Sequence, residues 1–464
     1  MFDPLRKASL ATFVTLTLAL PAQTTTPERP WIHHYDQTLT MKLKLATKIP
    51  GGGTHIETTL DQALNYVKQM DALTLGIPKI LYLVGWQYDG HDSKYPAFFE
   101  VNAALKRPQD ATALDSLKWF MQAAKQYHTT ISVHINLRDA YPSSPLWDFY
   151  VKHDLIQRGA DGQLAKGSIW GGEVSYRVCF TKEWDEGYTQ QRIDKLLKLL
   201  PLEEAGTVQI DAYYPTPCVG QHVSLEQEQE AQRKVYRYFR DRNIDVTGEK
   251  QGSEQGHWPS LVGLEPMAFW LAETPKEYLQ YPASLLTGGT AAKGGKDNEQ
   301  VDLTGKLFGS SFMAEGLFNG KSFLRFKHEF CTLTLPWYFL NQHKRLSVDA
   351  KSDSGTATFD DGVQTRVDAT GHITITQNNR TLRDGDDILI PANWIKARAL
   401  IAYSADGYKE KSWDLPPDWT GVSKIEIQEI TASGLHSMPA IATANGKVVL
   451  NLAPDQALLL SPTE

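Results

Sequence analysis

The sequence has few features that would assign it to a class of protein at once. Its 464 residues include three cysteines, Cys179, Cys218 and Cys331, and neither a CxxC pair nor an HExxH motif. This argues against a cysteine-rich metal centre and against the zinc-peptidase motif. Because the cysteines lie far apart in the sequence, we expect three isolated, buried and reduced thiols. In an exported chain, a single disulfide between two of them is the alternative.

The sequence also lacks an excess of basic residues and lacks long apolar runs. The sequence has 47 basic and 54 acidic side chains, a net charge of −7, so it offers no basic surface of the kind that binds nucleic acid. After the N-terminal segment no run reaches the about 18 apolar residues of a membrane-spanning helix, so no membrane insertion is expected once that segment is removed. A hydrophobic fraction of 41% with 22% charged residues is typical of a folded globular chain.

The N-terminal residues have the pattern of a secretion signal. A basic pair at 6–7 precedes an uncharged, mostly apolar stretch at 8–20, and the small residue Ala22 offers a cleavage site. We therefore predict a signal peptide at 1–22, a leader at 23–40, and a secreted or periplasmic protein. An uncleaved anchor or a misassigned start is the alternative interpretation.

Residues 55–345 alternate between helical and strand patterns. The motifs Thr59-x-x-Gln62 and Ser224-x-x-Gln227 are capping boxes, which open helices. Predicted strands, the third of them at 174–180, end near 86, 136, 180, 211 and 249, at intervals of 31 to 50 residues. This spacing is typical of strand–helix units in a parallel sheet. It indicates an α/β fold, a (β/α)8 TIM-type barrel over residues 41–348.

The pattern changes after residue 350. Short β-rich runs alternate with turn signals such as Asp384-Gly385 and Asp406-Gly407. We predict a C-terminal antiparallel β-sandwich over residues 349–464. No cofactor is predicted; a structural calcium ion in this domain is compatible with the sequence but not indicated by it.

Two carboxylates stand at the ends of neighbouring predicted strands, where the active sites of barrels lie. Asp211 directly follows Val208-Gln-Ile, and Glu249 takes the corresponding place on the next strand. Retaining glycosidases use two carboxyl groups about 5–5.5 Å apart, so we predict Asp211 as the nucleophile and Glu249 as the acid/base. We expect the charge of Asp211 to raise the pKa of Glu249. For a single aspartate, capping of a loop or helix is the alternative.

Further polar and aromatic side chains follow the predicted strand ends. Candidates for hydrogen bonds to sugar hydroxyls are His91, Asp92, His134 and Asn136. The histidines and the aspartate have an alternative role as divalent-metal ligands in a metal-dependent carbohydrate hydrolase or deacetylase. Candidates for stacking on a sugar ring are Trp86, Trp170 and Tyr213, for each of which core packing is the commoner use.

These motifs resemble those of a known family. The residues concerned are Gly85-Trp-Gln-Tyr-Asp-Gly-His-Asp-Ser93, His134-Ile-Asn136, the strand-closing Asp211 and Thr247-Gly-Glu249. Over residues 80–255 the sequence resembles the endo-α-N-acetylgalactosaminidases and their exo-acting relatives. The resemblance implies a retaining glycoside hydrolase that removes α-linked N-acetylgalactosamine, or the disaccharide built on it, from Ser or Thr of mucin-type glycoproteins. A glycan or glycoprotein is then the expected partner.

By position, the resemblance implies that Asp211 is the nucleophile and Glu249 the acid/base, while Asp92 and His134 bind the sugar in the innermost subsite.

The chain departs from the family in length, because endo-acting members carry extra β-domains around the barrel. Trp170 lies in a glycine-flanked segment that is a candidate for a shortened lid, and Lys250 follows the acid/base in place of a different family residue. Exo or endo action is therefore open. A non-catalytic glycan-binding protein on a barrel scaffold is the alternative function.

Overall fold

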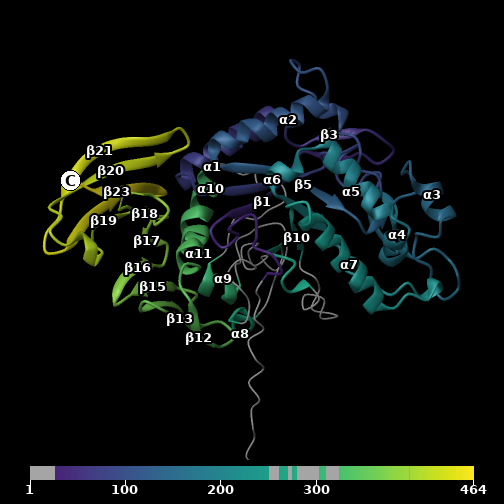
Figure 1. Ribbon diagram of the computed structural model, residues 1–464. Coiled ribbons are helices and arrows are strands. Elements are labelled where there is room, and N and C mark those ends of the chain that lie inside the picture. The colour runs from purple at the N-terminus through teal and green to yellow at the C-terminus, as the bar shows by residue number, and fades with distance from the viewer. Residues whose placement is uncertain are drawn as a thin grey trace, which may run out of the picture.

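The computed structural model describes residues 27–249, 261–269, 274–279, 302–309, 323–396 and 398–463. A region of parallel strands and helices lies beside a region of antiparallel strands (Figure 1). The predicted signal peptide and Lys250 fall outside the described residues. Within the ranges given, no helix combines the length and the apolarity that crossing a bilayer requires.

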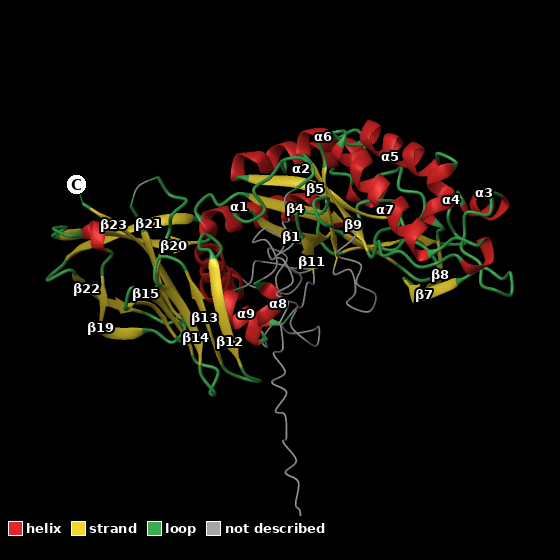
Figure 2. Cartoon of the chain, turned by 60° about the horizontal axis from the view of Figure 1, so that its bottom comes forward, coloured by secondary structure: helices red, strands yellow, loops and turns green. Residues whose placement is uncertain are grey.

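The first region is built on a parallel sheet. Its strands follow the order β1 (Leu39–Lys44), β4 (Lys79–Val84), β5 (Thr129–Asn136), β9 (Thr207–Asp211), β10 (Asp245–Glu249) and β11 (Ala268–Phe269). Every neighbouring pair runs parallel. Helices cover the outer face of the sheet (Figure 2): α1 (Leu60–Thr74), α2 (Ala113–Ala124), α5 (Tyr188–Leu199), α6 (Leu202–Ala205) and α7 (Leu225–Arg240). The parallel α/β arrangement agrees with the prediction.

Both predicted capping boxes are present. The Thr59 hydroxyl accepts the backbone N–H of Gln62 at the start of α1, and the Ser224 hydroxyl accepts that of Gln227 at the start of α7. Each bond satisfies an N–H group that has no partner inside the helix. Helix α1 ends at Leu75, whose φ of 53° turns the chain toward β4.

Side chains alternate between the two faces of the parallel strands. On β4, Leu81 and Leu83 belong to the core beneath the helices, whereas Tyr82 belongs to the cluster on the inner face. The Tyr82 hydroxyl lies 2.7 Å from Thr207 Oγ1 on β9, and its ring packs edge-on against Phe269 of β11. Because three strands separate β4 from β11, these contacts show that the sheet curls around its inner face. Closure into an eight-stranded barrel stays a prediction, since the described strands form a curled sheet of six.

The predicted third barrel strand at 174–180 is wrong. β8 (Glu173–Arg177) pairs antiparallel with β6 (Asp139–Ala140) and β7 (Lys166–Trp170) in a small separate sheet. In the parallel sheet, β5 pairs directly with β9. Polar residues alternate along β8, a pattern typical of an antiparallel strand with one solvated face rather than of a strand buried on both faces.

Residues 345–463 form the antiparallel region. Ten strands follow the order β12 (Arg345–Ala350), β13 (Gly355–Phe359), β14 (Val363–Val367), β15 (Ile373–Gln377), β16 (Arg380–Asp384), β17 (Asp387–Pro391), β18 (Leu400–Ser404), β23 (Gln456–Pro462), β20 (Lys424–Thr431) and β21 (Gly434–Ala442). Two more strands, β19 (Tyr408–Asp414) and β22 (Lys447–Leu452), pair with each other. Trp413 and Val448 of this pair share a core with Leu400 and Leu460 of the large sheet. The antiparallel character agrees with the prediction, while the boundary at 348/349 stays a prediction.

Helices near the end of the first region connect it to the large antiparallel sheet. α10 (Phe323–Glu329) and α11 (Leu335–Leu340) flank a π-helical turn, and a ring nitrogen of His328 lies 2.8 Å from the Tyr403 hydroxyl of β18. Trp394 donates its indole N–H to the carbonyl of Leu75 at the end of α1. The described residues also contain β2 (Ala46–Lys48), β3 (Thr54–Ile56), α3 (Trp147–Lys152), α4 (Phe180–Asp185), α8 (Pro275–Tyr278), α9 (Leu303–Phe308) and the short 3₁₀ turns Ala103–Leu105, Lys125–Tyr127, Val219–Gln221 and Pro417–Trp419.

The three cysteines are buried, as predicted, but they are not all isolated. Cys179, just before α4, and Cys218, in the loop after β9, lie side by side. Nothing in the sequence indicated this proximity, because it depends on how two loops pack.

Candidate active site

Asp211 and Glu249 end the adjacent strands β9 and β10. The register pairs Thr247 with Gln209, and two residues further along the strands it places Glu249 beside Asp211. An oxygen of each carboxyl group lies within 4.8 Å of the other and of a ring nitrogen of His134. Both carboxyl side chains are mostly buried, 15% and 17% exposed. The structure thus brings the two predicted carboxylates together.

The environment raises the pKa of Glu249 to about 7. Burial is the largest cause, because it disfavours the charged carboxylate, and the negative charge of Asp211 acts in the same direction. The sequence predicted the direction, but it named the neighbouring charge as the cause and not burial. Near neutral pH, Glu249 therefore exchanges a proton readily, as a general acid/base must.

Lys42 on β1 belongs to the site and was not predicted. Its side chain is fully buried; its ammonium pairs with Glu249 and lies 5.0 Å from the centre of the Phe269 ring. A buried ammonium needs a partner of opposite charge. Since β4, β5 and β9 separate β1 from β10, the Lys42–Glu249 pair spans the inside of the curled sheet. The sequence signal for it is a lysine inside the otherwise apolar start of β1.

Asn136, at the end of β5, orients Asp211. Its amide donates to Asp211 Oδ2 at 3.2 Å and to Asp139 Oδ2 at 2.8 Å, while its oxygen accepts the backbone N–H groups of Arg138 and Asp139. His134, on the same face of β5, places Nε2 3.5 Å from Asp211 Oδ2. Asp139 was not predicted; burial raises the pKa of its carboxyl group. The predicted residues His134 and Asn136 therefore do lie around Asp211.

His91 and Asp92 reach the site from the loop after β4. His91 Nε2 lies 3.2 Å from Asp92 Oδ2, and the His91 ring packs edge-on against that of His134. The loop is seated on the backbone of β2, where His91 N–H donates to the carbonyl of Ala46. Gly85, with φ +75°, is required there, because a Cβ would come within 2.0 Å of that carbonyl oxygen. A larger residue would displace the loop that carries His91 and Asp92.

Two of the three predicted stacking residues lie in the core. Trp86 is fully buried and donates its indole N–H to the backbone carbonyl of His134, and Tyr213 is 1% exposed and packs against Phe180 at 4.2 Å between ring centres. Neither ring faces solvent, so the expectation that they stack on a sugar is wrong. Trp170 on β7 is 49% exposed, and the next residue, Gly171, approaches the backbone of Asp92. Of the three, Trp170 stays a candidate.

Two other aromatic residues, Tyr95 and Tyr141, lie in the site instead of Trp86 and Tyr213. Burial, followed by the negative charge of Asp92, raises the pKa of both phenols, and the charge of Asp211 adds to it. Gln87 donates to the Tyr95 hydroxyl at 2.9 Å, and the two rings are 6.4 Å apart. Neither tyrosine was predicted from the sequence.

Around the carboxyl pair, the described residues offer a metal-binding arrangement that differs from the predicted one. His134, Asp211 and Glu249 present one nitrogen and two carboxylate oxygens within 4.8 Å of one another, a donor set suited to a divalent cation. His91 and Asp92 are not part of this group. The Lys42 ammonium pairs with Glu249 and so already supplies positive charge there.

A family comparison agrees with this geometry. Residues 40–247 match the family model described as endo-α-N-acetylgalactosaminidase. The chain resembles that glycoside hydrolase family. The matched residues include Asp92, His134 and Asp211 and end two residues before Glu249. The resemblance predicted from the motifs is confirmed.

A curated relative from Renibacterium salmoninarum carries the provisional name endo-α-N-acetylgalactosaminidase. It is 23% identical over 419 residues, which cover 86% of this chain and 25% of the relative. This chain therefore spans a quarter of the length of the curated relative that it matches.

Solved structures of the α-N-acetylgalactosaminidase NagBb from Bifidobacterium bifidum share the fold. The ligand-free form gives a TM-score of 0.55 at 13% identity, over 73% of this chain and 57% of NagBb. The form in complex with GalNAc gives 0.54 at 14% identity, over 74% and 58%. The likeness shows that the chain shares its fold with NagBb over about three quarters of its length.

Proposed function

We propose that the chain is a retaining glycosidase that cleaves α-linked N-acetylgalactosamine, or the disaccharide built on it, from mucin-type O-glycans. The observation that carries the proposal is the pair of carboxyl groups on adjacent strands, with the pKa of Glu249 raised to about 7. Retaining glycosidases need one ionised carboxylate and one protonated carboxylic acid on either side of the glycosidic bond. The family match and the NagBb-like fold support the choice of sugar.

The reaction proceeds in two displacements. Asp211, held by Asn136, attacks the anomeric carbon while Glu249 gives its proton to the departing glycosidic oxygen, so the bond to the leaving group breaks as the glycosyl–Asp211 bond forms. Glu249, now ionised, removes a proton from water, and the resulting oxygen nucleophile breaks the glycosyl–Asp211 bond. Both carboxyl groups return to their starting protonation states, and no cofactor takes part.

The neighbouring residues bind the sugar. Asp92, His91 and His134 present hydrogen-bonding groups on the same side of the carboxyl pair, and the exposed Trp170 offers an apolar face nearby. We also propose that the protein is secreted or periplasmic. The N-terminal signal pattern supports that location.

The experiment that tests this proposal is glycan release from a mucin, followed by mass analysis of the products. A released disaccharide indicates endo action and a released N-acetylgalactosamine exo action. No release, combined with measurable binding of the sugar, contradicts the proposal and favours a glycan-binding protein. Activity that a chelator abolishes and zinc restores would instead favour metal-dependent hydrolysis at His134, Asp211 and Glu249.

The pKa of Glu249 sets an expected pH dependence. Glu249 must be protonated in the free enzyme to act as the acid, so kcat/KM is expected to fall as the pH rises through about 7. Lys42 lowers this pKa, so Lys42→Met is expected to raise it and to move the alkaline limb to higher pH. The measurement is kcat/KM for an aryl α-N-acetylgalactosaminide from about pH 5 to about pH 9.

Lys79→Met is the matched control. Lys79 is also buried and also pairs with a carboxylate, Asp71, but it begins β4 and so lies at the opposite end of the sheet. Both variants lose a buried charge pair, yet only Lys42→Met should move the alkaline limb of the kcat/KM profile. If the limb stays where it is in Lys42→Met, a group other than Glu249 governs the profile.

A further inference from the structure

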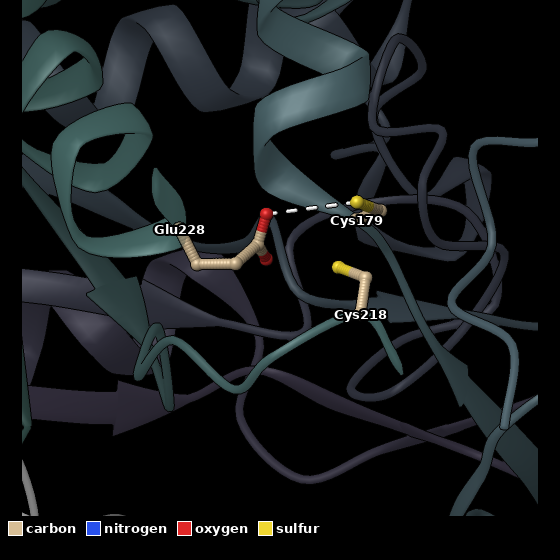
Figure 3. A group of neighbouring side chains, drawn as sticks. All are labelled: Cys179, Cys218 and Glu228. Atoms are coloured by element: carbon tan, nitrogen blue, oxygen red, sulfur yellow. Dashed lines mark hydrogen bonds between the residues drawn. The ribbon is translucent and has the colours of Figure 1, made fainter. Parts of the chain in front are cut away.

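Cys179 and Cys218 form a buried pair beside Glu228 (Figure 3). Both cysteine side chains are fully buried, and the two Sγ atoms and a Glu228 oxygen all lie within 4.8 Å of one another. The Cys179 thiol donates to Glu228 Oε1 at 3.6 Å. The two cysteines belong to segments that are far apart in the sequence, one leading into α4 and the other following the strand that carries Asp211.

The backbone around the two thiols is braced. The Gln157 side-chain amide donates to the carbonyls of Val178 and Thr216, at 3.3 Å each, and so ties together the segments that carry the cysteines. Cys179 N–H donates to the carbonyl of Leu155. Cys218 exchanges two backbone hydrogen bonds with Val223. The proximity of the sulfurs is therefore held by the fold and not by one side-chain rotamer alone.

Glu228 already has a structural role. Its two oxygens accept the backbone N–H groups of Phe180 and Thr181, at 3.1 and 2.8 Å, so it caps the start of α4 from helix α7. A divalent cation held by two thiolates and this carboxylate would leave one net negative charge fully buried. Among the described residues, the group also offers three ligands rather than the four of a closed structural zinc site. A covalent bond between the sulfurs leaves no such charge.

We propose that Cys179 and Cys218 are joined by a disulfide when the chain folds in an oxidising environment. The oxidant is a low-molecular-weight disulfide. One cysteine thiolate attacks it and releases a small thiol, and the second cysteine thiolate then attacks the mixed disulfide and releases the other small thiol. The protein loses two protons and two electrons, and the oxidant gains both. Because the folded chain buries both sulfurs, the exchange takes place while the two loops are still coming together.

The link acts on the loop after Asp211. It closes the chain between residues 179 and 218, a segment that contains α5 and β9, and fixes the middle of the connection from Asp211 to α7. A cross-link of this kind stabilises chiefly by restricting the unfolded chain. The oxidised protein should therefore melt at a higher temperature than the reduced protein, in measurements on the full chain.

The experiment is refolding of the reduced, denatured full chain in a glutathione redox buffer, followed by denaturation and alkylation with iodoacetamide. The proposal predicts one alkylated cysteine, Cys331, before reduction and three after it. A tryptic digest should contain the peptides 178–182 and 199–233 joined to each other. Cys331→Ala is the matched control, since it removes a buried cysteine outside the pair and should give no alkylation before reduction.

Three alkylated cysteines before reduction would overturn the proposal, as would a disulfide that involves Cys331. Zinc that copurifies with the chain and whose removal by a chelator exposes both thiols would also overturn it, in favour of a metal site. Melting provides a second measurement that does not depend on the folding of a variant. Reductant should lower the melting temperature of the wild type and of Cys331→Ala alike, and an equal melting temperature with and without reductant in both proteins counts against the link.

Discussion

Replacing Asp211 with alanine is expected to lower kcat/KM for an aryl α-N-acetylgalactosaminide by ~10⁴-fold or more, because no nucleophile then remains on that side of the sugar. Asp211 is held by Asn136 and His134 at the end of β9, so the smaller side chain should leave the sheet in place. The measurements are the steady-state kinetics and the melting temperature. Asp241→Ala is a matched control, since Asp241 is half-exposed and pairs with Arg29 away from the site.

Azide distinguishes a lost nucleophile from a general loss of structure. In Asp211→Ala, azide fits the space left by the carboxylate and attacks the anomeric carbon directly, so rescued turnover should give the β-glycosyl azide. Wild-type rates in this variant, or an α-glycosyl azide as the product, would show that Asp211 does not form the glycosyl–enzyme bond.

Replacing Glu249 with alanine is expected to have the second-largest effect, and the effect should depend on the leaving group. Substrates with poor leaving groups need the proton and should lose ~10²- to 10⁴-fold in kcat/KM, whereas a dinitrophenyl glycoside leaves without a proton and should lose far less. The alkaline limb near pH 7 should also disappear, since Glu249 is the group that titrates there. Kinetics on the two kinds of substrate at several pH values provide the test.

The product formed with azide also distinguishes the role of Glu249 from that of Asp211. In Glu249→Ala the glycosyl–Asp211 bond still forms, and azide replaces water in the second displacement, so the product should be the α-glycosyl azide. Opposite azide products from the two variants would assign the two carboxyl groups separately. The same loss for good and poor leaving groups in Glu249→Ala would contradict its role as the acid.

The carboxyl pair could be predicted from the sequence because its position depends on local rules. Strand spacing and the position of Asp211 and Glu249 at strand ends were enough to place them on neighbouring strands. The neighbours His134 and Asn136 followed from the same rule, since alternate residues of β5 face the same side. Their closeness to Asp211 in the structure comes directly from the pairing of β5 with β9.

What sequence reasoning missed depends on tertiary packing. Lys42 reaches Glu249 only because the sheet curls, and no local pattern states how far a sheet curls. Trp86 and Tyr213 follow strand ends as the predicted binding residues do, but their rings turn into the core. β8 was placed in the parallel sheet because its position in the chain suited the spacing, although its alternating pattern indicated an antiparallel strand.

The closeness of Cys179 and Cys218 is a further case. It arises where the loop after β9 packs against the segment before α4, and Gln157 and Glu228, both distant in sequence, fix that contact. Spacing between cysteines carries no information of this kind.

The most direct test of the central claim is to trap the glycosyl–enzyme. A ring-fluorinated α-N-acetylgalactosaminyl fluoride should react with the wild-type protein and hydrolyse slowly, so that the labelled chain can be digested and sequenced by mass spectrometry. The account predicts one sugar per chain, on the tryptic peptide 199–233 and at Asp211. A label on another residue, or turnover of the parent substrate that yields the β-anomer first, would contradict it.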